Sequence, residues 1–187
     1  MRKLIMWNVI TVDGCFEGEK PWDLAFHERI WGKELEDFGR EQVASADMII
    51  YGERTYKGMA EYWTKADPEN AETAAALNAI PKIVCSRTLE KAEWNNTTIV
   101  RDAVVELAKL KEQGDGNMFV FGSGILSESL MNAGLFDEYR LAVAPVILGK
   151  GRHLFTEGTD RQNLKLIESR QLETGGVILK YAPASQI

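Results

Sequence analysis

The sequence has little of three features that would assign it to a specialised class of protein. Its 187 residues include two cysteines, Cys15 and Cys85, whose spacing fits neither a metal site nor a disulfide framework, so we expect reduced thiols and no metal. The formal net charge is −6, and without a broad basic surface we expect no binding to nucleic acid. No stretch approaches the ~20 apolar residues of a membrane span and no signal peptide is recognisable, so we expect a cytoplasmic protein without membrane contacts.

The overall composition is typical of a soluble globular protein. Hydrophobic residues make up 45% of the chain and charged residues 27%, which provides enough apolar surface for one sizeable core. Internal repeats, low-complexity tracts and linkers are not recognisable. The sequence therefore predicts a single domain over residues 1–187.

Strand and helix patterns alternate along the first two thirds of the chain. Short apolar runs predict buried strands at 4–10, 46–51, 82–85, 99–100 and 118–121. Apolar spacings of three and four predict a helix over 22–45, broken at Gly32 or Gly39, and helices over 54–62, between the turn at 67–70 and Pro81, over 103–113 and over 125–133.

The last third of the chain predicts strands alone. A long strand is expected at 138–146, and the runs at 164–170 and 177–181 flank a Gly-Gly turn that predicts an antiparallel closing hairpin. Alternating strands and helices favour a parallel sheet with right-handed crossovers. The predicted fold is therefore an α/β three-layer sandwich with a mixed, mainly parallel central sheet and an antiparallel C-terminal hairpin.

One strand runs directly into a helix through Gly122-Ser123-Gly124. Two glycines allow a sharp turn and a close approach of the backbone to a ligand, and the free N–H groups and positive dipole of the helix start suit a phosphate. Many strand-to-helix turns use glycine only to fit. On this stretch alone, a nucleotide site and a plain turn are equally good interpretations.

Three further loops follow predicted strands in the same way: 11–14, 52–56 and 86–88. In this order the four loops resemble those of the dihydrofolate reductase-like superfamily. Residues 145–155 are similar to a segment of the reductase domain of bacterial riboflavin biosynthesis and its stand-alone relatives. The resemblance extends from Leu4 to Tyr181. The His-x-Glu and Cys-x-x-Cys pattern of the zinc deaminase that accompanies that reductase in the riboflavin pathway is absent, so we do not expect deaminase activity from this chain.

The resemblance implies NADPH as the cofactor. Taken by itself, Arg87 is more typical of a solvated surface arginine, but its place after a buried strand in this order of loops favours a pairing with the 2′-phosphate. Two positions depart from the family pattern: Glu53 replaces a basic residue and Ile125 replaces an arginine. A carboxylate at Glu53 would disfavour a 2′-phosphate and suit the free ribose of NADH. The cofactor-binding residues implied are Thr11, Gly52, Arg54, Thr55, Ser86, Arg87, Gly122, Ser123, Gly124, Ile125 and Leu126.

A reductase of this kind would move a hydride to a small heterocyclic or carbonyl substrate and would need a proton. The resemblance places Asp13 near the nicotinamide and His27 where the family carries a helical carboxylate, so both are candidate catalytic residues. Asp13 precedes a glycine and is also a common turn former, and His27 is also typical of a structural histidine. The alternative function is a nucleotide-binding protein without catalysis. Since stand-alone relatives often pair, a homodimer is expected.

Overall fold

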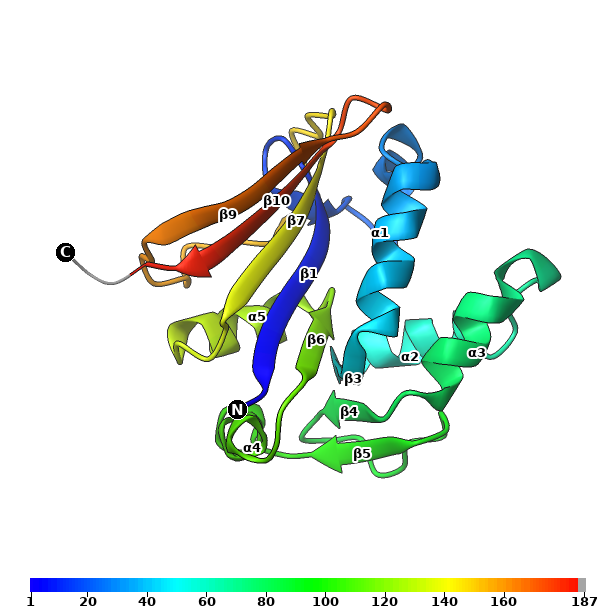
Figure 1. The fold of residues 1–187 in the computed structure, drawn as a ribbon, viewed down its shortest axis with the longest axis vertical. Coiled ribbons are helices and arrows are strands. Elements are labelled where there is room, and N and C mark those ends of the chain that lie inside the picture. The colour runs from blue at the N-terminus through cyan, green and yellow to red at the C-terminus, as the bar shows by residue number, and fades with distance from the viewer. Residues whose placement is uncertain (185–187) are drawn as a thin grey trace.

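The computed structural model describes residues 1–184, which form an eight-stranded sheet with helices on both faces (Figure 1) and a separate two-stranded sheet. The order of the large sheet is β5-β4-β3-β6-β1-β7-β10-β9. Its strands are β1 (Lys3–Thr11), β3 (Ala46–Gly52), β4 (Lys82–Cys85), β5 (Thr97–Val100), β6 (Asn117–Phe121), β7 (Glu138–Ala144), β9 (Leu164–Gln171) and β10 (Val177–Pro183).

The strand directions confirm the predicted fold class. From β5 to β7, each strand runs parallel to its neighbours. β10 pairs antiparallel with β7 and with β9, which makes the closing hairpin. Because parallel strands are covered on both faces, β6 reads as an uninterrupted apolar run, and Met118 through Phe121 are all buried.

The helices form the two outer layers. α4 (Ala103–Glu112) and α5 (Gly124–Asn132) pack on one face, where Leu107 and Leu130 join the core. α1 (Lys33–Ala44), α2 (Glu53–Trp63) and α3 (Ala71–Ala79) cover the other face, which Figure 1 shows on the right. The connections between the layers include the short 3-10 helices η1 (Ala25–Arg29) and η2 (Pro68–Asn70).

The helix predicted over 22–45 is wrong in its first half. Residues 22–24 have no helical structure, η1 occupies five residues, and α1 begins only at Lys33. Trp22 has a φ of 63°, a left-handed conformation that an α-helix excludes. The break falls at Gly32, which has extended backbone angles and serves as the N-cap of α1, whereas Gly39 lies inside α1.

The two-stranded sheet was not predicted. β2 (Cys15–Glu17) pairs antiparallel with β8 (Arg152–His153). These segments of three and two residues are too short to show an alternating pattern, and they lie more than 130 residues apart in the chain. Their pairing brings the loop after β1 and the glycine-rich loop after β7 together at one edge of the molecule.

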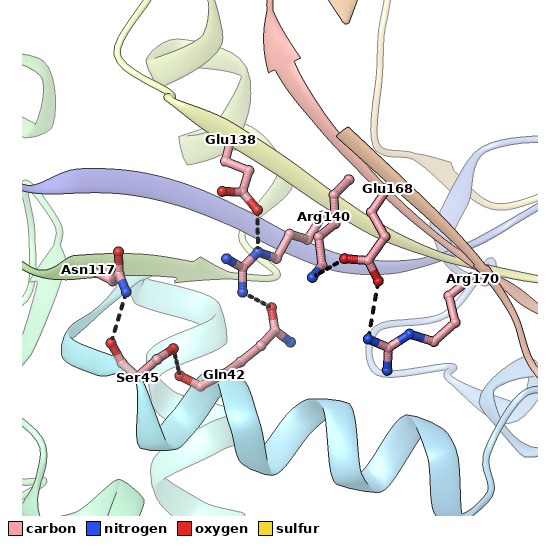
Figure 2. Close-up of polar contacts among 8 residues, drawn as sticks. Gln42, Ser45, Asn117, Glu138, Arg140, Glu168 and Arg170 are labelled. Atoms are coloured by element: carbon pink, nitrogen blue, oxygen red, sulfur yellow. Dashed lines mark hydrogen bonds and ion pairs between the residues drawn. The ribbon is translucent and has the colours of Figure 1, made fainter. Parts of the chain in front are cut away.

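Polar contacts tie α1 to the sheet and link the two strands of the closing hairpin (Figure 2). Gln42 Oε1 on α1 accepts a hydrogen bond of 3.5 Å from Arg140 Nη1 on β7. Arg140 Nε in turn donates to Glu138 at 2.7 Å, and Glu168 on β9 accepts from Lys180 on β10 at 2.7 Å. These half-buried pairs hold α1 against β7 and β9 against β10.

Candidate cofactor and substrate cleft

A cleft of about 610 Å³ crosses the carboxyl ends of four neighbouring strands, β4, β3, β6 and β1. With ~4.8 Å between neighbouring strands, these ends span ~14 Å. Open α/β sheets bind ligands in such a crevice, at the point where the chain connections change face. Here α2 leaves β3 on one face and α5 leaves β6 on the other, so the cleft lies at this switch point.

Two open helix N-termini meet in the middle of the cleft. The N-caps of α2 and α5, Gly52 and Ser123, provide no side-chain cap, and the first N–H groups of any helix have no partner within it. The hydroxyl oxygen of Ser123 accepts a hydrogen bond from the Gly52 N–H at 2.9 Å, which links the turn between β3 and α2 directly to the turn between β6 and α5. Both helices therefore direct their positive ends into the same space.

The glycine corner is sterically tight. Ser123 itself is buried with a φ of 63°, an uncommon left-handed conformation for a residue other than glycine. A Cβ on Gly122 would lie 3.3 Å from the Thr55 methyl carbon, and a Cβ on Gly124 would lie 2.8 Å from the ring of Phe16. Thr55 and Phe16 thus approach the backbone of this turn as closely as glycine permits.

Two arginines border the β4 end of the cleft. Arg87 and Arg101 are both exposed, and neither forms an ion pair within residues 1–184. Arg101 Nη1 donates to the carbonyl oxygen of Ser86 at 2.9 Å, which places its guanidinium beside the loop that carries Arg87. This end of the cleft can therefore bind a group with several negative charges.

Glu53 also lines the β4 end, but its carboxylate is occupied. Its oxygens accept hydrogen bonds from Lys57 at 2.6 Å, from the Ser86 hydroxyl and from Thr88 at 2.8 Å. The Lys57 bond, then those from Ser86 and Thr88, lower the pKa of Glu53 to about 2. The acid that departs from the family pattern therefore organises the loop after β4. The Ser86 hydroxyl is engaged in the same contact.

An ionised cluster lies at the opposite, β1 end. Glu17 on β2 is buried, and its carboxylate accepts hydrogen bonds from Arg54 on α2, from Arg152 on β8 at 2.9 Å and from the Trp22 N–H at 2.7 Å. Burial raises the pKa of Glu17, but the bonds from Arg54, the Trp22 amide and Arg152 outweigh it, so the net shift is downward. Glu17 is therefore an anion that holds two cations on the wall of the cleft.

Two further polar side chains line the same end. Asn8 on β1 is 4% exposed, and its Nδ2 has no hydrogen-bond partner among the described residues. His27 on η1 is half-buried, and burial lowers its pKa to about 4. At neutral pH His27 is therefore an uncharged imidazole, which can donate one N–H hydrogen bond but carries no extra proton.

Thr11 and Asp13 do not line the cleft, which corrects both expectations. The Thr11 hydroxyl donates to Asp13 at 2.6 Å and accepts the Cys15 N–H, so it is used inside the loop. The Asp13 carboxylate accepts the N–H groups of Gly149 at 2.8 Å and Leu148 at 3.2 Å, and the Thr11 hydroxyl together with these amides lowers its pKa to about 2. The Asp13 carboxylate holds the loop after β1 against the loop after β7, and we do not retain Asp13 as a catalytic candidate.

The other predicted residues do meet in the cleft: His27, Gly52, Arg54, Thr55, Ser86, Arg87, Gly122, Ser123, Gly124, Ile125 and Leu126. Of these, Arg54 forms an ion pair with Glu17 on the wall of the cleft. Sequence reasoning missed Arg101, Glu17 and Arg152. Arg101 directly precedes Asp102, the N-cap of α4. From this position in the sequence, its side chain could have been predicted to lie near a helix N-terminus. Nothing local marks the other two, because they meet only through the pairing of β2 with β8.

Comparison with known proteins identifies the relatives of this chain. The model of the RibD C-terminal domain family matches residues 2–178. The chain belongs to the RibD C-terminal domain family. The uncharacterized protein YyaP of Bacillus subtilis is 30% identical over 184 residues, which cover 96% of this chain and 94% of YyaP. The recognition made from the loop order is therefore confirmed.

Solved structures agree at the level of the fold. A putative riboflavin biosynthesis protein from Shewanella sp. PV-4 superposes with a TM-score of 0.79 at 18% identity, covering 97% of this chain and 99% of that one. Dihydrofolate reductase from Enterococcus faecalis superposes with a TM-score of 0.63 at 15% identity, covering 98% and 97%. This family member therefore has the dihydrofolate reductase-like fold over its whole described length.

Residues 1–184 contain neither a metal-binding cluster nor a membrane-spanning helix. No group of three or more His, Cys, Asp or Glu side chains is placed to hold a metal ion. None of the helices combines the length and apolar character that crossing a membrane requires.

The Ser123 corner generates a prediction about backbone strain. Ser123→Ala and Ser123→Gly both remove the hydroxyl that accepts the Gly52 N–H, but only glycine adopts a φ of 63° without a steric cost. Both variants should therefore be less stable than wild type, and the glycine variant should exceed the alanine variant by ~1 kcal/mol in urea unfolding. Equal stabilities would show that the left-handed conformation carries no strain.

His27 generates a prediction about pH. Its pKa of about 4 in the folded state lies below the ordinary value of 6.5, so the unfolded state binds the proton more readily. Its contribution to stability is fully present above pH 6.5 and is lost as pH falls toward 4. Between pH 7 and pH 5 the unfolding free energy should fall by ~2 kcal/mol more in wild type than in His27→Gln. Parallel pH profiles of the two proteins would contradict the low pKa.

Proposed function

We propose that this chain is an NAD(P)H-dependent reductase that transfers a hydride to a small heterocyclic or carbonyl substrate. The observation that carries the proposal is the pair of uncapped helix N-termini, those of α2 and α5, linked by Gly52 and Ser123 inside one cleft. Two such N-termini suit the two phosphates of a dinucleotide. Family membership supports the same activity, and the E. faecalis enzyme of the same fold is complexed with NADP(H).

The residues present fit a dinucleotide. Gly122 and Gly124 let Thr55 and Phe16 pack directly against the turn, and the helix start that follows has no side-chain cap, so its first N–H groups can donate to a ligand. Arg87 and Arg101 provide positive charge at the β4 end, and the unpartnered Nδ2 of Asn8 provides a buried donor at the β1 end. The cleft thus offers phosphate partners at its middle and one end, and a polar contact at the other.

The cofactor, when bound, supplies the hydride, and the protein contributes binding and orientation. The α2 and α5 N-termini would hold the diphosphate, and Arg87 with Arg101 the adenosine side. The β1 end would then accommodate the nicotinamide and the substrate, where Phe16 and Leu24 would provide apolar contacts and His27 would donate a hydrogen bond. Since His27 is uncharged at neutral pH, its role is to orient or polarise the substrate rather than to deliver a stored proton.

We propose NADPH over NADH as the preferred cofactor. A free carboxylate at Glu53 would repel a 2′-phosphate. The Glu53 carboxylate is instead paired with Lys57 and accepts hydrogen bonds from Ser86 and Thr88. Arg87 and Arg101 remain available beside it. A charge-assisted hydrogen bond contributes ~1.5–3 kcal/mol, which is about ten- to a hundredfold in affinity.

The alternative is nucleotide binding without catalysis, and one observation favours it. Glu17 at the β1 end and Glu53 at the β4 end both have lowered pKa values, so neither carboxyl group holds a proton at neutral pH. A site without a ready acid can bind a cofactor and still fail to reduce a substrate that needs one. Turnover with at least one pterin, pyrimidine or carbonyl substrate decides between the two functions.

We also propose that the chain forms a homodimer through the edge strand β9. Edge strands leave a row of backbone groups unpaired, and an edge strand can pair antiparallel with its own copy across a two-fold axis. Leu166 and Ile167 on β9 are 50% and 54% exposed. An apolar exposed edge of this kind is commonly covered in the assembled protein.

The cofactor proposal predicts a selective loss. Titration by nicotinamide fluorescence should show NADPH binding at least tenfold tighter than NADH. Arg87→Ala and Arg101→Ala should each weaken NADPH about tenfold or more while changing NADH by less than about threefold. The matched control is Arg161→Ala, an exposed arginine outside the cleft, which should change neither. If neither cofactor binds to wild type, the reductase proposal is wrong.

The dimer proposal predicts a surface-specific effect. Sedimentation of the wild-type protein should give a dimer, and Ile167→Glu should give a folded monomer because it places charge on the paired edge. Val105→Glu changes an apolar side chain of similar exposure on α4 and should leave the dimer intact. A wild-type monomer, or a dimer that survives Ile167→Glu, would count against β9 as the interface.

A further inference from the structure

The ionised cluster at the β1 end has a composition that structural stabilisation alone does not explain. Glu17 is 4% exposed, whereas the side chains of Arg54 and Arg152 are 45% and 38% exposed. A buried carboxylate is costly to desolvate, and such pairs are weak sources of stability. The arrangement does fix two guanidinium groups, from α2 and from β8, on the same wall of the cleft.

Arg54 and Arg152 each have guanidinium N–H groups that Glu17 does not use. A guanidinium has five N–H groups, and both arginines use part of theirs on Glu17. Two cations against one carboxylate leave the cluster with a net charge of +1. The remaining acidic residues that line the cleft are Glu53 in the first turn of α2, which is bound by Lys57, and Asp102 at the N-cap of α4.

The neighbours of the cluster suit a planar, polar ligand. The Arg152 guanidinium lies 5.4 Å from the centre of the Phe16 ring, a cation–π contact that further fixes its position. Asn8, at the same end of the cleft, presents a buried Nδ2 that has no hydrogen-bond partner within residues 1–184. An unpaired buried donor costs free energy unless a ligand accepts from it.

We propose that Arg54 and Arg152 form a recognition pair for anionic oxygens on the substrate, and that Glu17 is the positioning residue that sets the two guanidinium groups. The substrate would carry a carboxylate or a phosphate monoester, groups that match the fork of an arginine. The proposal rests on the proposed reductase function for its assignment to the substrate. The anion site itself rests on the geometry of the cluster.

The competing assignment is the cofactor diphosphate, because Arg54 belongs to the first turn of α2. The test therefore uses protein with labelled arginine side chains, whose Arg54 and Arg152 signals are identified by their loss in Arg54→Lys and Arg152→Lys. Inorganic phosphate and acetate are titrated separately at constant ionic strength, with and without saturating NADP⁺. Arg87→Ala is the matched control for phosphate bound at the other end.

The expected result is saturable binding of at least one anion that shifts the Arg54 and Arg152 signals both with and without NADP⁺. Arg54→Lys and Arg152→Lys should each weaken it about fivefold or more, and Arg87→Ala should leave it unchanged. Which anion binds more tightly tells a phosphate monoester from a carboxylate. Anion binding that disappears when NADP⁺ is present would assign the two arginines to the cofactor and overturn the proposal. Signal shifts that are confined to other arginines, or the absence of saturable anion binding, would also overturn it.

Glu17→Gln separates positioning from simple charge. Removing the carboxylate raises the net charge of the cluster, so a purely electrostatic role predicts tighter anion binding. A positioning role predicts binding at least threefold weaker, because a glutamine cannot hold two guanidinium groups, and tighter binding would overturn it. If phosphate binds at Arg54 and Arg152 but NADP⁺ does not bind at all, the anion site stands and the reductase function falls.

Discussion

The hydrogen bond from the Gly52 N–H to the Ser123 hydroxyl is the contact on which the cleft depends. β3 and β6 are neighbours in the sheet although α2, α3, β4, β5 and α4 separate them in the chain. Parallel pairing brings their carboxyl ends to one edge, but only a contact between the two turns fixes how the helices leave that edge. Ser123 makes this contact from a left-handed conformation, so the geometry of two helix starts rests on one strained residue.

The distribution of charge follows from this arrangement. The chain carries a net charge of −6, yet the cleft is bordered by Arg54, Arg87, Arg101 and Arg152 and by two helix N-termini. Of the acidic residues that line the cleft, Glu17 is held by two arginines and Glu53 by Lys57, while the Asp102 carboxylate accepts the Val105 N–H at the start of α4. An acidic protein can therefore concentrate an anionic ligand locally without a basic surface that would attract polyanions in general.

Sequence reasoning recovered the parts of this structure that depend on short segments. A buried strand that ends in glycine can be predicted from its apolar run, such as Met118 to Phe121 in β6. The order of the loops that follow these strands was enough to recognise the fold. Asp13 was misjudged because an Asp-Gly turn looks the same whether its carboxylate faces a ligand or two backbone amides, and here it binds Leu148 and Gly149. Partners more than 130 residues away leave no local trace, which is also why the Glu17 and Arg152 contact was missed.

The source of the proton constrains which reductions this cleft can support. Glu17 and Glu53 are ionised at neutral pH, and burial raises the pKa of Cys85 to about 12, so its thiol holds its proton too tightly to act as an acid. His27 keeps the single N–H of a neutral ring because its pKa is about 4. Since none of these four groups is poised to donate a proton near neutral pH, we expect the proton that accompanies a hydride to come from solvent or from the substrate itself. That requirement favours a substrate whose accepting atom stays in contact with water at the open side of the cleft.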